Sequence, residues 1–261
     1  MTTDAEEWQR WTEARVASVS APHGVLALTG THWLSADPAA IPGVPGRWSA
    51  EPDGVRVSAS AADGLRGGAG DEVVAGEPLL RPDTHPEAAV VRYGEVLLIP
   101  IEREGELALR VFDPDAEGRV HFAGISTFPY APEWSVPAVF TPYETGARTV
   151  TVPNADGRER PLAVAGQVAF RLAGESYSLT VSHSGDQLSA VFADAGSGRE
   201  SYRFRFITLP GPDAEGHTVL DLNRAYLPPC AFADHFICPF PPPGNRLPVA
   251  VRAGEKAVLS G

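Results

Sequence analysis

Two cysteines and a histidine near the end of the chain are spaced so that they could bind a metal. They form a Cys-x4-His-x2-Cys pattern of Cys230, His235 and Cys238, and Asp221 or Asp234 is available as a fourth ligand. Thiolates and imidazoles are the ligands of structural zinc. However, this spacing is not a standard zinc pattern, and the chain contains no CxxC pair. Packed thiols that act as small hydrophobic groups are therefore favoured, and no metal or other cofactor is predicted.

The same two thiols lie eight residues apart across a turn-rich stretch, a separation that permits disulfide geometry. Thiols of cytoplasmic proteins are kept reduced. We therefore expect Cys230 and Cys238 to lie near each other as free thiols.

Polar residues and prolines are concentrated in the segment 221–256, which begins at Asp221 and ends at Lys256. Arginine and asparagine present fixed donors, so this segment can form one wall of a pocket for a carboxylate or carbonyl ligand. In the alternative interpretation, Arg224 and Arg246 brace the Pro-rich turns by binding backbone carbonyls. The candidate ligand-binding residues in this segment are Asp221, Asn223, Arg224, Tyr226, His235, Asn245 and Arg246.

Arg110 is a further candidate. In the stretch ELALRVFD it lies on the opposite face of a predicted strand from Leu107 and Leu109. An arginine that points into a barrel needs a carboxylate partner or an anionic ligand.

Motifs of nucleophilic, nucleotide-dependent and zinc-dependent catalysis are absent from the chain. The stretches GSGRES and SHSGD are predicted to be turns, and there is no G-x-S-x-G, HExxH, P-loop or GxGxxG motif. Two function classes remain open. One is a protein that binds or transforms a small organic ligand, with an anion among the candidates, and the other is a structural or interaction module.

The elements that must position these residues begin with a predicted helix over residues 4–20. Thr3 or Asp4 can cap it, and Trp8, Trp11 and Arg15 recur at spacings of three and four. Its apolar stripe is expected to lie against the rest of the fold.

From about Gly46 onward, the chain contains short runs in which apolar and polar residues alternate, separated by Gly, Pro, Asp and Asn. In ESYRFRFITL, Phe204 and Phe206 are predicted to point to one face, and Arg203 and Arg205 to a solvent-exposed face. Such strands indicate a mainly β fold, an antiparallel β-barrel or sandwich with an N-terminal helix. We expect residues 1–45 to pack on one β domain formed by residues 46–261. Strands are predicted at residues 54–60, 88–104, 106–113, 149–154, 166–174, 175–184, 187–195, 200–210 and 217–223.

Several longer motifs occur together in this chain. They are EEWQRWTEAR, GVLALTGTHWL, FADAGSGRESYRFRF, LDLNRAYLPPCAF, CPFPPPGNRLPVAV and AGEK. This combination resembles the bacterial family catalogued as domain of unknown function 1684, and the resemblance covers almost the whole chain. It implies no particular activity and no catalytic residues.

Composition narrows the partners and the location. The chain has 21 Lys and Arg against 33 Asp and Glu, a net charge of −12, which repels nucleic acid and anionic lipid. The N-terminal stretch is acidic and contains tryptophans, unlike a signal peptide, and no long apolar run follows. We therefore expect a cytoplasmic protein with a small-molecule partner and with no nucleic-acid or membrane partner.

Overall fold

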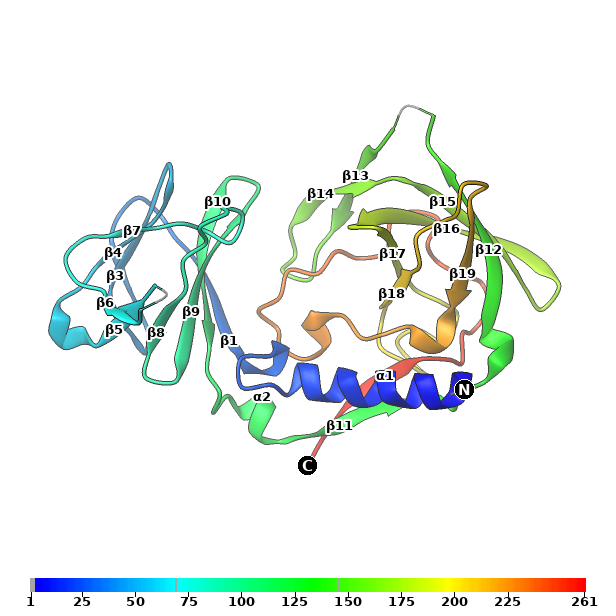
Figure 1. The fold of residues 1–261 in the computed structure, drawn as a ribbon, viewed down its shortest axis with the longest axis horizontal. Helices are drawn as coiled ribbons and strands as arrows, with labels where there is room; N and C mark the ends of the chain where they lie inside the picture. The colour runs from blue at the N-terminus through cyan, green and yellow to red at the C-terminus, as the bar shows by residue number, and fades with distance from the viewer. Residues whose placement is uncertain (1–2, 69, 145) are drawn as a thin grey trace. The chain divides into compact units, whose positions relative to one another are not determined.

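The chain folds into two compact units. The computed structural model describes residues 3–68, 70–144 and 146–261 (Figure 1). The larger unit combines residues 1–17 with residues 122–261, and the smaller unit comprises residues 18–121. This division differs from the boundary expected near residue 45, because residues 18–45 group with the strands that directly follow them.

The smaller unit is built from two antiparallel sheets around one apolar core. Trp48, Val55, Leu98 and Leu109 are buried in that core. The first sheet has the order β1-β10-β9-β8-β5-β6 and the second has the order β2-β3-β4-β7. The strands are β1 (Leu28–Trp33), β2 (Ala39–Ile41), β3 (Val44–Glu51), β4 (Gly54–Ser58), β5 (Leu65–Gly67), β6 (Glu72–Val73), β7 (Leu79–Leu80), β8 (Val91–Tyr93), β9 (Val96–Arg103) and β10 (Glu106–Phe112). A short helix, α2 (Glu117–Val120), lies near the end of this unit, and 3-10 turns occupy Val25–Ala27 and Ala61–Asp63.

The larger unit is organised around a curved six-stranded antiparallel sheet, a half-barrel with the order β18-β17-β16-β15-β12-β19 (Figure 1). Alternate residues of these strands, such as Leu179, Phe192, Ile207 and Leu220, enter its core. The sheet strands are β12 (Ser135–Pro142), β15 (Gly166–Leu172), β16 (Glu175–Ser184), β17 (Gln187–Phe192), β18 (Arg205–Leu209) and β19 (His217–Asp221). Two further antiparallel pairs are β11 (Phe122–Thr127) with β20 (Glu255–Ser260), and β13 (Arg148–Pro153) with β14 (Glu159–Val164). Three 3-10 turns occupy Pro132–Trp134, Leu222–Arg224 and Pro229–Ala231.

Residues 4–17 of helix α1 (Asp4–Val19) belong to the larger unit. Its first turn is closed by a reciprocal pair, because Thr3 Oγ1 accepts the Glu6 amide and Glu6 Oε2 accepts the Thr3 amide. The indole of Trp8 donates to the carbonyl of Asn223 over 2.9 Å. The mainly β, antiparallel fold with an N-terminal helix is therefore confirmed. Within the described ranges, no helix is both long and apolar enough to cross a bilayer.

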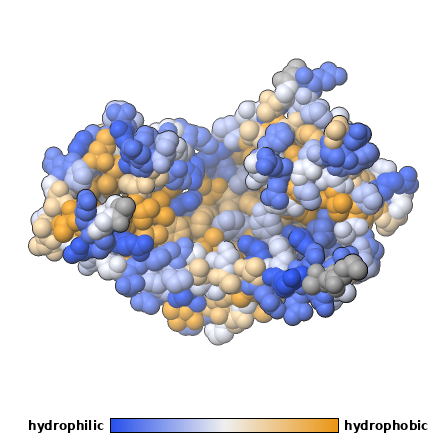
Figure 2. Space-filling view, viewed as in Figure 1, coloured by the Kyte–Doolittle hydropathy of each residue, from blue (hydrophilic) through white to orange (hydrophobic). Residues whose placement is uncertain are grey.

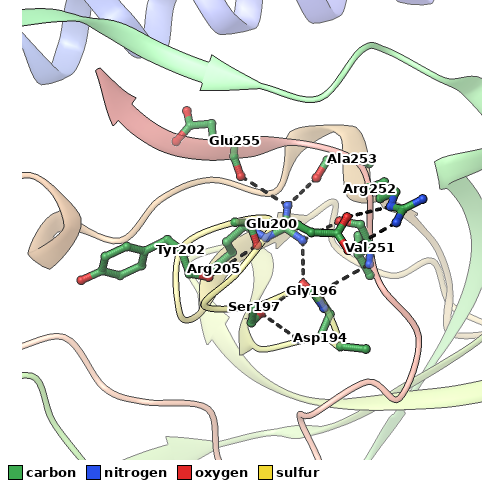
Figure 3. Close-up of polar contacts among 12 residues, drawn as sticks. Asp194, Gly196, Ser197, Glu200, Tyr202, Arg205, Val251, Arg252, Ala253 and Glu255 are labelled. Atoms are coloured by element: carbon green, nitrogen blue, oxygen red, sulfur yellow. Dashed lines mark hydrogen bonds and ion pairs between the residues drawn. The ribbon is translucent and has the colours of Figure 1, made fainter. Parts of the chain in front are cut away.

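The prediction for Arg205 was wrong. The strand expected over residues 200–210 begins only at Arg205, whose side chain is fully buried rather than facing solvent. Its guanidinium donates to Asp194 Oδ2 over 2.8 Å and to the carbonyls of Val251 and Ala253 (Figure 3). Alternation predicted a solvent-facing side chain, but residues 251–255 cover Arg205 with their backbone carbonyls.

Candidate functional site

A cavity of about 740 Å³ opens in the larger unit where α1 meets the sheet. Helix α1 contributes one wall, and the strands β12, β18 and β19 with the turn after β19 contribute the other. Its lining is mixed, with carboxylates, guanidinium groups and aromatic rings. The lining residues are Asp4, Glu7, Trp11, Arg15, Tyr130, Ser135, Gln187, Thr208, Pro210, Val219, Asp221, Arg224 and Tyr226.

Arg15 is held in this wall by a buried carboxylate. Its guanidinium donates to both carboxylate oxygens of Glu255, over 2.8 and 3.1 Å, and Glu255 is 1% exposed. Glu255 also accepts the Leu227 amide over 2.7 Å. The guanidinium carbon of Arg15 lies 4.9 Å from the centre of the Tyr226 ring, a cation–π contact. These contacts fix the orientation of α1 and of Tyr226 together.

Arg224 lies between two carboxylates at the edge of the cavity. Its Nε is 3.3 Å from Asp221 Oδ2, and its Nη2 is 3.9 Å from Glu7 Oε2. Asp221 ends β19 and caps the following 3-10 turn by accepting the Asn223 amide. That cap places the Asp221 and Arg224 side chains at the same opening.

Asn223, one of the predicted ligand-binding residues, is fully buried and holds the backbone. Its side-chain Oδ1 accepts a hydrogen bond from the Ala131 backbone amide over 3.1 Å, and its Nδ2 donates to the Ala131 carbonyl over 2.9 Å. It therefore ties the turn after β19 to the loop that carries Tyr130. The pKa of Tyr130 is raised, first by desolvation and then by the carboxylates of Asp4 and Asp221.

A second cavity of about 260 Å³ shares Thr208 and Tyr226 with the first. The two hydroxyl groups lie 3.4 Å apart. The Tyr226 ring packs edge-on against Phe206, with ring centres 5.9 Å apart. The other lining residues are mainly apolar or small, namely Leu162, Val164, Thr180, Ser182, Ser184, Ser189, Ala190, Val191, Phe206, Pro239 and Pro242.

The remaining sequence candidates lie elsewhere. Asn245 is buried and clamps two strands, because it exchanges hydrogen bonds with the Thr180 backbone and donates to the Val191 carbonyl. Arg246 and His235 are exposed and line neither cavity. Arg110 belongs to the smaller unit.

The bracing predicted for Arg224 and Arg246 is made by other arginines. Arg224 pairs with carboxylates, and within the described part of the chain no hydrogen bond joins Arg246 to a backbone carbonyl of the Pro-rich segment. Arg205 and Arg15 bind that segment's carbonyls instead, at Val251, Ala253 and Leu227. Arginines do brace this segment by donating to several of its backbone carbonyls, as expected, but these arginines lie in β18 and α1.

The two thiols lie close together, as predicted. Both are buried and neither is part of a disulfide, and the Cys230 amide donates to Cys238 Sγ over 3.3 Å. The hydrogen bond from Cys238 lowers the pKa of Cys230 to about 7, helped by Tyr202 and Arg203 and opposed by burial. Burial, followed by the charge of the Cys230 thiolate, raises the pKa of Tyr202 to about 12.

These thiols and His235 do not form a metal centre in the described residues. His235 is exposed, whereas the two thiols are buried. The ligand atoms of these three residues do not form a group within 4.8 Å of one another among the described residues. The group that does gather comprises Asp213, Glu215 and His217 in an exposed turn. There, Asp213 Oδ1 already accepts the amides of Glu215 and His217.

Sequence reasoning missed the contribution of α1 to the cavity. Trp11 and Arg15 were recognised as one helix face, but an apolar stripe alone does not distinguish a face that packs on the core from one that borders a cavity. The available signal was the combination of tryptophan, arginine and acidic residues along that face.

The family comparison agrees with the sequence motifs. Residues 120–256 match the family described as protein of unknown function (DUF1684). An uncharacterised protein of Haloarcula marismortui, solved by solution NMR, is 35% identical, with a TM-score of 0.43. That match covers 52% of this chain and 77% of the other. No curated protein matches the sequence.

Proposed function

Since the chain belongs to DUF1684, a family of proteins of unknown function, we propose its function from the cavity itself: the larger unit binds a small organic molecule between α1 and the half-barrel sheet. The observation that carries this proposal is the convergence of charged and aromatic side chains around one cavity. Its volume of about 740 Å³ lies in the range of about 300–1,000 Å³ that is usual for ligand pockets.

The way the lining is held also supports binding. Arg15, Asp221 and Tyr226 each have their orientation fixed by neighbouring groups, by Glu255, by the turn after β19 and by Phe206, respectively. Side chains fixed in this way lose little entropy when a ligand binds. A structural or interaction module needs no such cavity, so we favour ligand binding over that alternative. Cytoplasmic location stays a prediction from the sequence.

A fragment screen with a filled-cavity variant tests the proposal. Val219 lines the cavity and is 44% exposed, so Val219→Trp fills the space without disturbing the core. Val139, on the adjacent strand β12, is 42% exposed and lies outside the lining, so Val139→Trp is the matched control. The probes are a set of small anionic, neutral and cationic aromatic fragments, observed by saturation-transfer NMR.

We expect some fragments to bind the parent protein and Val139→Trp but not Val219→Trp. If no fragment binds the parent, or if every bound fragment also binds Val219→Trp, the larger cavity is not a ligand site.

A further inference from the structure

The two arginines of the larger cavity are already matched by carboxylates. The charge of Arg15 is balanced by Glu255, which lies behind the cavity wall. Arg224 lies 3.3 Å from Asp221 and 3.9 Å from Glu7, and Asp4 is a third carboxylate of the same lining. The first turn of α1 contains Asp4, Glu6 and Glu7, and Figure 2 shows a largely hydrophilic surface around the start of this helix. The cavity therefore has an excess of negative charge, which disfavours an anionic ligand.

Aromatic rings accompany these carboxylates. Trp11, Tyr130 and Tyr226 line the same cavity. One of these rings already holds a cation, because the guanidinium of Arg15 is stacked on Tyr226. Aromatic faces combined with carboxylates are the features that recognise ammonium groups. Both the charge and the rings thus favour a cationic group.

The smaller cavity supplies the apolar part of the site. It meets the larger one at Thr208 and Tyr226, which line both. Beyond them lie Phe206, Val191 and Pro239, and the described residues that line this cavity include no charged side chain. A molecule that extends through both cavities would therefore have one end among charged side chains in the larger cavity and the other end among apolar side chains in the smaller cavity.

We propose that the ligand is an amphipathic amine, whose ammonium group lies among Asp4, Glu7 and Asp221 and whose alkyl or aryl part passes Tyr226 into the smaller cavity. This inference rests on the proposed ligand-binding function and names its ligand class. It replaces the anion that arginines in the sequence suggested, because both arginines that line the cavity have carboxylate partners.

Three homologous series serve as probes: n-alkylamines, n-alkyl carboxylates and n-alkyl alcohols, from ethyl to octyl. Their affinities for the full chain are measured by isothermal titration calorimetry at neutral pH. We expect the amines to bind at least tenfold more tightly than carboxylates of equal length. Affinity should rise about fourfold per methylene, as burial of about 0.8 kcal/mol per CH₂ implies, until the smaller cavity is full.

Two variants separate the charged end from the apolar end. Glu7→Gln removes one exposed carboxylate and should weaken every amine several-fold without changing the dependence on chain length. Ser189→Leu narrows the smaller cavity, so long amines should lose their advantage while short amines keep their affinity. Ser178→Leu, on the neighbouring strand β16 and outside the lining, should leave both unchanged.

The outcomes distinguish this inference from the proposed function. If carboxylates bind more tightly than amines, or if neither variant alters amine binding, the ligand class is wrong while the cavity remains a binding site. If none of the three series binds, but fragments bind the parent and fail to bind Val219→Trp, the inference of an amphipathic amine is again wrong. If neither the series nor the fragments bind the parent, the proposed function itself fails.

Discussion

The guanidinium of Arg205 donates to the carboxylate of Asp194 over 2.8 Å, and the two side chains are 0% and 1% exposed. Burial lowers the pKa of Arg205, and the neighbouring Asp194 charge opposes that shift. The same guanidinium binds the carbonyls of residues 251 and 253, so it joins β18 to the last part of the Pro-rich segment.

Removal of this guanidinium should be costly. We expect Arg205→Ala to lower the free energy of unfolding of the larger unit by about 3–5 kcal/mol, because the Asp194 carboxylate stays buried without its partner. Urea unfolding, followed by NMR amide intensities of that unit, measures the loss. The control is Arg252→Ala, which removes an exposed partner of Glu200 and should change the midpoint little. Equal losses in the two variants would contradict a structural role for the buried pair.

Asn245 and Arg246 are neighbours with opposite roles, which gives a matched pair of variants. Asn245→Ala leaves the backbone of Thr180 and the carbonyl of Val191 without partners. We expect it to destabilise the larger unit by about 1–3 kcal/mol. Arg246→Ala removes an exposed side chain and should leave the unfolding midpoint close to that of the parent. If Arg246→Ala proves the more destabilising variant in the same urea titration, then Arg246 braces the segment, as the sequence predicted, and the bracing role assigned to Asn245 is wrong.

The ion pair of Arg15 with Glu255 should control how firmly α1 is held. We expect Arg15→Ala to accelerate hydrogen exchange along α1, because the buried Glu255 loses its counter-charge. Adding Glu255→Gln should restore part of the protection, since the amide oxygen still accepts from Leu227 and carries no charge. Arg10→Ala, on an exposed part of the same helix, is the control. Unchanged α1 protection in Arg15→Ala would show that the ion pair with Glu255 does not hold the helix.

The Cys230 thiol should titrate near neutral pH. Its pKa of about 7 lies below the ordinary 9.0, so the thiolate is stabilised in the fold, chiefly by Cys238. The stability that it contributes is complete above pH 9.0 and is lost as the pH falls through about 7. The unfolding free energy of the parent relative to Cys230→Ala should therefore decrease over that interval.

Alkylation rates of Cys230, followed by mass spectrometry against pH, give the pKa directly. Cys238→Ala should move the apparent pKa upward, because the hydrogen bond from Cys238 is the largest cause of the shift. An apparent pKa that does not move would contradict this assignment.

The sequence alone predicted the features that depend on local periodicity. The stripe of Trp8, Trp11 and Arg15 indicated α1, and the alternating runs indicated β4 and β8 to β10 of the smaller unit and β13 and β15 to β19 of the larger unit. The eight-residue separation of Cys230 and Cys238 predicted that the two thiols would lie near each other, as they do. These features follow from residues only a few positions apart, since helix and strand periods are short.

Only the tertiary structure decided which surfaces are covered. Arg205 alternates like a solvent-facing residue, but residues 251–255 cover its face of the strand. The candidate cavity joins residues 4–15 to residues 130–135, 187 and 208–226, and the side chain of Arg15 finds its partner 240 positions away. Asp221, Arg224 and Tyr226 line that cavity, whereas Asn223 and Asn245 became internal braces. No local pattern separates these outcomes, because burial and pairing are set by long-range packing that brings distant segments together.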